Sequence, residues 1–419
     1  MDRELGVVEE ETVNGDQMLL PEQSSVCVGM GWEDTPVGAD ASNADDAARA
    51  LQLQEGDDMA RQQEEYLLDL SVSKEEVIWR IEQCTFWLLR TIKQGKSPKI
   101  SFPEMKGTAK RPDCSLRDKG SRFARLWSVL NAAHEMLRHG TTCTQRDLYY
   151  GLKSGIPTLH SMQLATAIED AVQLLKVPRF QLGIACSSKG LVSGPLLIST
   201  RGQGCSSRED GMVSCVSRRC PQGFSITGNI KDILEMKFVC HATHIVIVEK
   251  DTVFQRLIAY SEEEMLRGVL LVTAKGFPDV ATRMFVWRIR QMHPHIPIVG
   301  IVDWNPSGAS IMSLYRYGSD RMVESSSCAL SDIGWLGIRQ SMIREIGHDS
   351  FQKMSDRDVK LASGLVKKLK GKNNAAWAEE VECMMISGVK VDIEQLYSSC
   401  GFSGICAIIT RMLIEKKWV

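Results

Sequence analysis

The sequence of 419 residues lacks any apolar run approaching the roughly 20 residues that span a bilayer. Its opening residues, MDRELGVVEEETVNGDQ, are acidic and lack the apolar stretch of a secretory signal. We therefore expect no membrane partner. Thirteen cysteines without such a signal predict reduced thiols in the cytosol or nucleus. The sequence also lacks a GxxxxGK[ST] phosphate loop, so nothing in it predicts ATP hydrolysis by this chain.

The net charge of −2 conceals an uneven distribution along the chain. Residues 1–66 hold 17 Asp/Glu and 3 Lys/Arg, which leaves 35 acidic and 47 basic residues for the remainder. The acidic head is poor in aromatic residues and rich in Gln, Ser, Gly and Ala, a composition typical of disorder. The basic remainder suits a polyanionic partner, although a solvated Lys/Arg surface would give the same count.

Four helices are predicted in the first part of the basic region. They cover residues 74–94, 121–138, 145–153 and 159–176. Thr144 is placed as the N-cap of the third helix. Two apolar runs, FQLGIAC and LVSGPLLIS, flank the turn SSKG and predict a β-hairpin. Three helices followed by such a hairpin are the pattern of a winged-helix DNA-binding domain.

After residue 243 the pattern changes to strands that alternate with helices. The apolar runs THIVIVE, GVLLVT and IPIVGIVD predict strands, and VATRMFVWRIRQMH and PSGASIMSLYRYGS predict helices. Such alternation predicts a parallel sheet, with ligands at the carboxyl ends of its strands. The loop before it, at about 199–226, holds Cys205, Cys215 and Cys220, whose spacing fits no standard zinc signature even with His241 added. We expect a linker or insertion at 201–240.

Two carboxylates end predicted strands, namely Glu249 and Asp303. If the strands are neighbours, both side chains project into one crevice, where two acids repel unless a cation neutralises them. Hard oxygen ligands favour Mg²⁺, which keeps several waters and bridges to phosphate. The alternative is that each acid caps the helix that follows its strand.

The segment TQRDLYYGLKSG, residues 144–155, places Tyr149 beside Tyr150, with Arg146 one helical turn before Tyr150. Tyrosine pairs are commonly packing residues. A phenol is a poor nucleophile at neutral pH because its ordinary pKa is about 10. It becomes effective when neighbouring cations favour phenolate or a base removes its proton in the transition state.

Five blocks of the sequence together resemble one family. They are RDLYY, VPRFQLGIACSSKGLVSG, IVIVEKDTVFQRL, TAKGFPDVATR and IVDWNPSGASIMSLYRYGS. In this order and spacing they are similar to the A subunit of topoisomerase VI and its meiotic relative, the sporulation-eleven double-strand-break transesterase. The similarity covers roughly residues 75–419 and is more specific than a single short motif.

The resemblance implies a mixed α and α/β protein of two folded modules. A winged-helix domain of the catabolite-activator type, at 71–200, would bear a catalytic tyrosine. After the linker at 201–240, a Toprim domain with a parallel sheet, at 241–419, would bind metal. Residues 1–70 would form the acidic, largely disordered head.

The resemblance also assigns the site residues. Tyr150 would be the nucleophile and Tyr149 a packing residue, with Arg146 favouring phenolate and contacting the scissile phosphate. Glu249, Asp303 and Asn305 would hold Mg²⁺. The family commonly has Asp-x-Asp where this chain has Asp303-Trp304-Asn305, and an amide offers an oxygen without charge.

Four cations are candidate DNA contacts: Lys153, Lys189, Lys250 and Arg283. The alternative interpretation is that they are solvated surface residues.

Three functions fit the resemblance. The first is a nuclear transesterase that makes meiotic double-strand breaks through a 5′-phosphotyrosyl link. The second is the A subunit of a complete type IIB topoisomerase, and the third is a DNA-binding paralogue that cleaves weakly or not at all. The implied partners are double-stranded DNA, a topoisomerase VI B-like subunit that meets helix 74–94, and a second A-type chain in a homodimer or a heterodimer with a paralogue.

Overall fold

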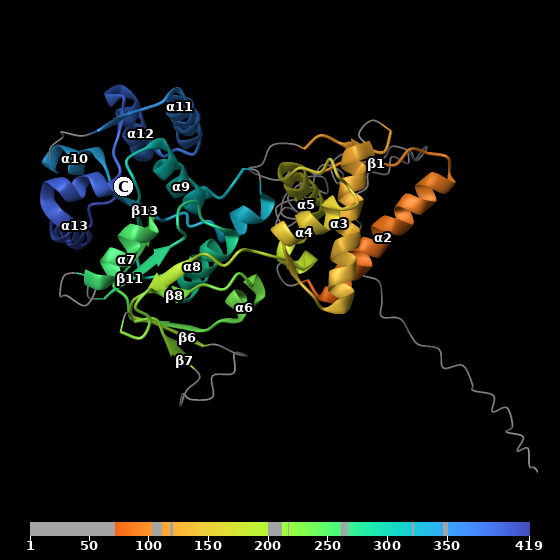
Figure 1. Ribbon diagram of the computed structural model, residues 1–419, viewed down its shortest axis with the longest axis horizontal. Helices are drawn as coiled ribbons and strands as arrows, with labels where there is room; N and C mark the ends of the chain where they lie inside the picture. Colours follow the sequence, from red (N-terminus) through yellow and green to blue (C-terminus); the bar gives the residue numbers. More distant parts are fainter. Residues whose placement is uncertain are drawn as a thin grey trace, which may run out of the picture. The chain divides into compact units, whose positions relative to one another are not determined.

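The computed structural model describes residues 72–102, 111–117, 120–199, 212–216, 218–260, 266, 268–320, 322–346 and 351–419 (Figure 1). All of them belong to the unit formed by residues 43–419. The predicted acidic head and Cys205 lie outside the described residues. Buried apolar side chains form two separate clusters, one between Val77 and Ile184 and one between Val192 and Leu413.

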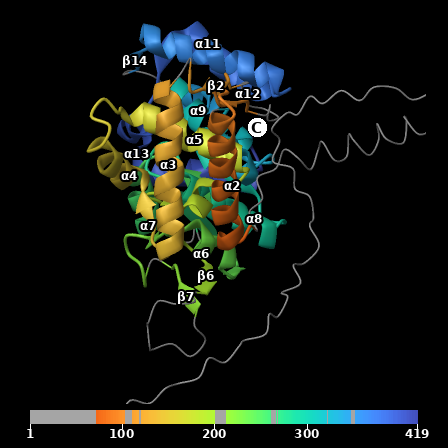
Figure 2. The same ribbon diagram turned by 90° about the vertical axis from the view of Figure 1, so that its right-hand side faces the viewer.

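The first cluster is enclosed by four helices, which confirm the predicted helices to within two residues at each end. They are α2 (Lys74–Lys93), α3 (Gly120–His139), α4 (Gln145–Lys153) and α5 (Ser161–Leu175). Apolar residues three or four apart line the inner face of α3, where Leu126, Val129 and Leu130 are buried. Helices α2 and α3 lie side by side in both views (Figures 1 and 2). Between them in sequence, β1 (Lys99–Ile100) pairs with β2 (Cys114–Ser115).

The predicted β-hairpin after α5 is wrong. Residues Arg179–Leu182 form the short 3-10 helix η1, and β4 (Ile184–Ala185) pairs in parallel with β3 (Cys143–Thr144). The second apolar run divides at Gly194, whose φ of 135° breaks the strand. Its two halves, β5 (Leu191–Ser193) and β6 (Leu196–Ser199), join different sheets. Both halves bury apolar side chains in the second cluster. Each strand therefore pairs within its own sheet, and the two apolar runs do not form a hairpin.

The strand β6 is the centre of a three-stranded antiparallel sheet. Its neighbours are β7 (Met212–Ser214) and β9 (Phe238–Cys240).

A six-stranded sheet organises the second cluster. Its strand order is β13-β12-β10-β11-β5-β8. The first four are parallel, which confirms the predicted parallel sheet: β10 (His244–Val248), β11 (Val269–Thr273), β12 (Ile298–Ile301) and β13 (Gly334–Gly337). The strands β5 and β8 (Phe224–Ser225) extend it with antiparallel pairs. The central strands are buried on both faces, as their continuous apolar sequences require.

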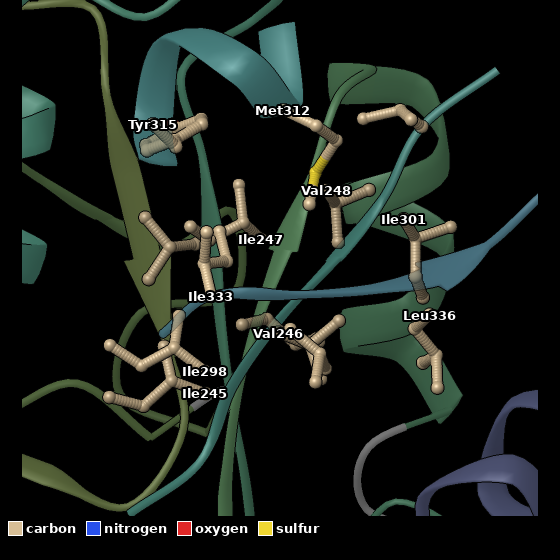
Figure 3. Close-up of a cluster of buried hydrophobic side chains, with 14 of the residues drawn as sticks. Ile245, Val246, Ile247, Val248, Ile298, Ile301, Met312, Tyr315, Ile333 and Leu336 are labelled. Atoms are coloured by element: carbon tan, nitrogen blue, oxygen red, sulfur yellow. The ribbon is translucent and has the colours of Figure 1, made fainter. Parts of the chain in front are cut away.

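Three helices follow the parallel strands in turn: α7 (Asp251–Tyr260), α8 (Val280–Met292) and α9 (Pro306–Tyr317). Met312 and Tyr315 of α9 lie over Ile247 and Val248 of β10 (Figure 3). Gly300 of β12 permits this close approach, because a Cβ there would lie 2.2 Å from the Met312 sulfur.

The remaining described elements all fall within residues 230–414. They are α6 (Ile230–Glu235), η3 (Val323–Cys328), α10 (Gln340–Ile346), β14 (Gln352–Lys353), α11 (Asp356–Gly371), α12 (Ala375–Ser387), β15 (Val389–Lys390), η4 (Ile393–Leu396) and α13 (Tyr397–Ile414). The described part of the chain contains no helix long and apolar enough to cross a membrane.

Candidate functional site

The helix that carries the tyrosine pair is short and firmly capped. The Thr144 hydroxyl accepts the Asp147 backbone N–H at 3.2 Å, and the Asp147 carboxylate accepts the Thr144 backbone N–H at 3.2 Å. This reciprocal capping box fixes the start of α4. Leu148 is buried and attaches the helix to the first hydrophobic cluster. The backbone around the tyrosines is therefore positioned by both capping and packing.

The two tyrosines have different surroundings. Tyr149 is half-buried, donates its hydroxyl to the Leu159 carbonyl at 3.3 Å and accepts the Lys153 ammonium at 2.9 Å. Tyr150 is 64% exposed, and its ring meets the Tyr149 ring edge-on at 5.4 Å. Arg146, one turn earlier on α4, is also exposed. Tyr149 is a packing residue in this arrangement. The Tyr150 phenol and the Arg146 guanidinium are both accessible to a ligand from solution.

The two strand-end carboxylates lie together. Since β10 and β12 are parallel neighbours, their carboxyl ends meet at one edge of the sheet. The Asp303 backbone N–H donates to Glu249 Oε2 at 2.9 Å, and the Glu249 backbone N–H donates to the Ile301 carbonyl at 3.1 Å. The expected proximity of Glu249 and Asp303 is thus observed, while their binding of a cation stays a prediction.

Both carboxyl groups are held in a low-dielectric environment. Burial, together with the charge of Asp303, raises the pKa of Glu249 to about 7. Burial also raises the pKa of Asp303 to about 6, although a backbone N–H and the Lys250 ammonium oppose that rise. Burial therefore disfavours the charged forms of both carboxyl groups, and a bound cation would favour those forms.

Asp303 receives contacts from a distant part of the chain. Its Oδ1 accepts the Ile393 backbone N–H at 2.9 Å, and its Oδ2 lies 3.0 Å from the Lys250 ammonium. The same ammonium lies 2.6 Å from Glu394 and 3.8 Å from Asp392. Burial alone would lower the pKa of Lys250, but its hydrogen bonds to Glu394 and Asp303 raise it. Lys250 is therefore a permanent cation beside the carboxylates.

Sequence reasoning missed Asp392 and Glu394. They lie about ninety residues after Asp303, in the segment VDIEQL, where two acids stand two positions apart. This spacing was a weak signal of paired carboxylates. Nothing in the sequence indicated which sheet edge they would reach.

Asn305 has a structural role in the described conformation. It is the N-cap of α9, and its Oδ1 accepts the Gly308 backbone N–H at 2.8 Å. The same oxygen has a second lone pair that could bind a metal, so the role of Asn305 as a metal ligand stays a prediction. Gly308 allows the helix to approach the carboxylates, because a Cβ there would lie 2.4 Å from the Asp303 carbonyl and 3.2 Å from Glu249 Oε2.

The donor set fits a hard divalent cation. Glu249 and Asp303 offer carboxylate oxygens and Asn305 an amide oxygen, the ligand types that Mg²⁺ prefers. Within the described ranges, no three His, Cys, Asp or Glu side chains are grouped to hold a metal. A cation at Glu249 and Asp303 would thus keep several waters, as Mg²⁺ commonly does.

The four predicted DNA contacts differ in accessibility. Lys153 is exposed, and Lys189 is half-buried and donates to the Phe277 carbonyl at 2.7 Å. Arg283 is 1% exposed and donates to the Ser325 hydroxyl at 2.7 Å. The Lys250 ammonium is engaged by carboxylates. The prediction that Arg283 contacts DNA is therefore wrong for this conformation, because its side chain is enclosed, whereas a DNA contact by Lys250 stays a prediction.

A parallel sheet with a glutamate after one strand and an aspartate after its neighbour is the arrangement of a Toprim-type protein. Residues 244–408 match the family model for the Toprim domain of Spo11 and of the topoisomerase 6 A subunit. Residues 121–184 match the model "Type IIB DNA topoisomerase". The chain belongs to the family of topoisomerase 6 A subunits and Spo11 proteins.

Individual relatives agree with this assignment. The meiotic recombination protein SPO11-2 of Oryza sativa subsp. japonica is 34% identical over 303 residues, covering 71% of this chain and 74% of the relative. The meiotic recombination protein SPO11 of Mus musculus is 29% identical, covering 77% and 84%. The A subunit of DNA topoisomerase 6 from Arabidopsis thaliana is 29% identical, covering 69% and 65%.

Proposed function

We propose that this protein is a DNA transesterase that makes double-strand breaks in meiosis and so initiates homologous recombination. The observation that carries the proposal is the exposed phenol of Tyr150 beside Arg146, on a capped helix within the segment that matches the type IIB topoisomerase model. Relatives named as meiotic recombination proteins support the meiotic role. The direct test is recovery of DNA whose 5′ ends are covalently attached to the protein.

The DNA-binding module in this proposal is a winged-helix domain of the catabolite-activator type, within residues 71–200. The helices α3, α4 and α5 supply its helical part, although the predicted wing is replaced by strands that join other sheets. Lys153 and Lys189 are the proposed contacts to the DNA backbone. Residues 241–419 supply most of the Toprim domain. Since the proposed reaction acts on chromosomal DNA, the proposed location of the protein is the nucleus.

The proposed reaction exchanges one ester bond for another. The Tyr150 oxygen attacks a backbone phosphorus, a bond forms between them, and the bond from phosphorus to the 3′ oxygen breaks. The departing strand takes up a proton as a 3′-hydroxyl, while the phosphate stays on Tyr150 as a 5′-phosphotyrosyl ester. Arg146 orients the phosphate and favours the phenolate form of the attacking group.

Glu249 and Asp303, with the Asn305 amide oxygen as a third donor, would hold Mg²⁺ at the sheet edge. When bound, such a cation supplies positive charge to the phosphate oxygens as negative charge develops. Glu249 and Asp303 would bind it through carboxylate oxygens at the ends of neighbouring strands. Gly308 keeps the start of α9 close to both carboxylates.

Metal binding at this pair is expected to weaken at acid pH. Because burial raises the pKa of Glu249 to about 7 and that of Asp303 to about 6, a cation must displace protons below neutrality. We expect the apparent affinity for Mg²⁺ to fall roughly tenfold from about pH 7 to about pH 6, to fall more steeply below that, and to level off above about pH 7. Calorimetric titration from pH 6 to 8 measures this affinity. An affinity that does not change over this pH range would contradict the prediction.

The same pKa shifts determine whether the free energy of unfolding rises or falls with pH when no metal is bound. Both carboxyl groups bind protons more tightly in the folded than in the unfolded chain. Their contribution to the free energy of unfolding is present below an unfolded pKa of about 4 and is lost as pH rises to about 7. Added Mg²⁺ should restore stability most strongly at the upper end of this range.

A B-like subunit is the proposed partner of α2. Large apolar side chains of this helix stay exposed, namely Trp79, Phe86, Leu89 and Ile92. A groove of about 590 Å³ between α2 and α3 is lined by Phe86, Leu89 and Trp127. An apolar groove of this kind suits a partner helix. One nucleophile per chain cuts one strand, so a double-strand break also requires a second A-type chain, in a homodimer or a heterodimer with a paralogue.

Replacing both Phe86 and Leu89 by Asp is expected to weaken binding of the B-like subunit at least about tenfold, since buried aromatic anchors dominate interface energies. Both side chains are more than half exposed, so the fold should persist. Co-purification and calorimetry with the B-like subunit measure the change. Ile386→Asp is the matched control, because Ile386 is 85% exposed on α12. Equal loss in both variants would contradict a specific site on α2.

A second candidate function is the A subunit of a complete type IIB topoisomerase, supported by relatives that carry this name. Relaxation of supercoiled DNA in the presence of ATP and the B-like subunit would favour it over break formation. The uncharged amide of Asn305, at a position where the family commonly has a carboxylate, supports a third candidate, a paralogue that binds DNA but cleaves weakly or not at all.

A further inference from the structure

Lys250 brings three carboxylates from two segments of the chain around one ammonium group. Its Nζ lies 3.0 Å from Asp303 Oδ2 and 2.6 Å from Glu394 Oε2, with Asp392 at 3.8 Å. Glu394 is itself held, because its Oε1 accepts the Thr252 hydroxyl at 3.1 Å. The shortest contact of the ammonium is thus with an acid that is separate from the proposed metal ligands.

This arrangement matters for the metal centre because both oxygens of Asp303 are engaged. Oδ1 accepts the Ile393 backbone N–H at 2.9 Å, and Oδ2 contacts the Lys250 ammonium. A divalent cation that binds Asp303 meets this ammonium on the same carboxylate. Two cations that contact the same carboxylate repel each other strongly in a partly buried site. The ammonium needs another acid to hold it when the metal arrives.

We propose that Lys250 neutralises the Asp303 carboxylate when no metal is bound. Glu394 is the positioning residue that draws the ammonium away from Asp303 when a divalent cation binds. The proposal rests on the metal centre at Glu249 and Asp303 proposed above. Glu394 acts through Lys250 and is not a ligand. In this proposal the 3-10 helix η4 therefore influences the affinity of a site formed by strands far earlier in the chain.

The test is a double-mutant cycle on the full chain, with Mn²⁺ as the probe and free Mn²⁺ measured by electron paramagnetic resonance. Glu394→Gln is expected to weaken Mn²⁺ binding about tenfold, because the ammonium then rests on Asp303. Lys250→Met is expected to strengthen binding by a similar factor. Adding Glu394→Gln to Lys250→Met should cause little further change, since the group through which Glu394 acts is gone.

Glu382→Gln is the matched control. It breaks another ion pair of the same length, 2.6 Å between Lys370 and Glu382, and is expected to leave Mn²⁺ binding unchanged. Equal weakening by Glu394→Gln with and without Lys250 would overturn the proposal, because Glu394 would then act by its own charge or as a ligand. No weakening in either background would overturn it as well.

The cycle also separates this inference from the metal centre itself. A wild-type chain that binds no Mn²⁺, or whose binding is unchanged by Glu249→Gln, would overturn the metal centre and this role of Lys250 together. Binding that is lost in Glu249→Gln but additive in the cycle would overturn the role of Lys250 alone.

Discussion

A Tyr150→Phe variant is expected to form no covalent adduct with DNA. The substitution removes one oxygen, and that oxygen is the proposed attacking atom. Because no other group can replace it, we expect adduct formation to fall by at least about a thousandfold. The side chain is 64% exposed and its hydroxyl has no packing role, so folding and DNA binding should be retained. Adducts are measured by denaturing gel analysis of end-labelled DNA.

Tyr149→Phe is the matched control for this prediction. It removes the hydroxyl that bonds to Leu159 and Lys153, at a cost to stability of about 1 kcal/mol. Adducts should persist in this variant. Adducts that survive in Tyr150→Phe and disappear in Tyr149→Phe would transfer the nucleophile to Tyr149, and survival in both would end the proposed mechanism.

Glu249→Gln and Asp303→Asn are each expected to remove metal-dependent cleavage. Each replaces a charged oxygen by an amide of nearly the same shape, so the packing of the sheet edge changes little. The loss of one anionic ligand removes several kcal/mol of cation binding and transition-state stabilisation, which predicts a decrease of roughly a hundredfold or more. The measurement is adduct formation as a function of Mg²⁺ concentration.

Asp251→Asn provides the control for the metal prediction. Asp251 stands two residues after Glu249, but its carboxylate accepts the Gln255 amide at 3.2 Å and pairs with Lys275 at 3.3 Å. Its loss should leave the Mg²⁺ dependence unchanged. The assignment of the metal ligands is refuted by an unaltered divalent-ion dependence in both Glu249→Gln and Asp303→Asn.

Local sequence signals predicted the helices and the parallel strands well, because capping and periodicity are encoded within a few residues. Thr144 caps α4 as expected, and the apolar runs that end at Glu249 and Asp303 form parallel strands. The juxtaposition of the two carboxylates followed from a general property of parallel sheets. The helices and strands required no knowledge of contacts between distant segments, whereas the juxtaposition of the carboxylates depended on β10 and β12 being neighbours.

Long-range contacts account for the failures. The run after α5 has the alternation of a hairpin, yet β5 pairs with β11 because the sheet edge there offers hydrogen bonds that the local sequence cannot reveal. Arg283 occupies a position on α8 that faces the core, where one of its terminal nitrogens donates to the Ser325 hydroxyl at 2.7 Å. Glu394 reaches Lys250 across more than 140 positions. Pairings of this kind depend on topology and not on local composition.

The place of β5 in the six-stranded sheet limits how the protein can be divided. A fragment that begins at residue 241 would keep the metal ligands but lose Leu191, Val192 and Ser193, which pair with Thr273, Val272 and Leu271. The flank of β11 would then present unpaired backbone groups beside apolar side chains, a template for aggregation. Recombinant work on the metal-binding half should therefore retain the chain from before Leu191, even though this stretch is continuous with the half that bears the tyrosine.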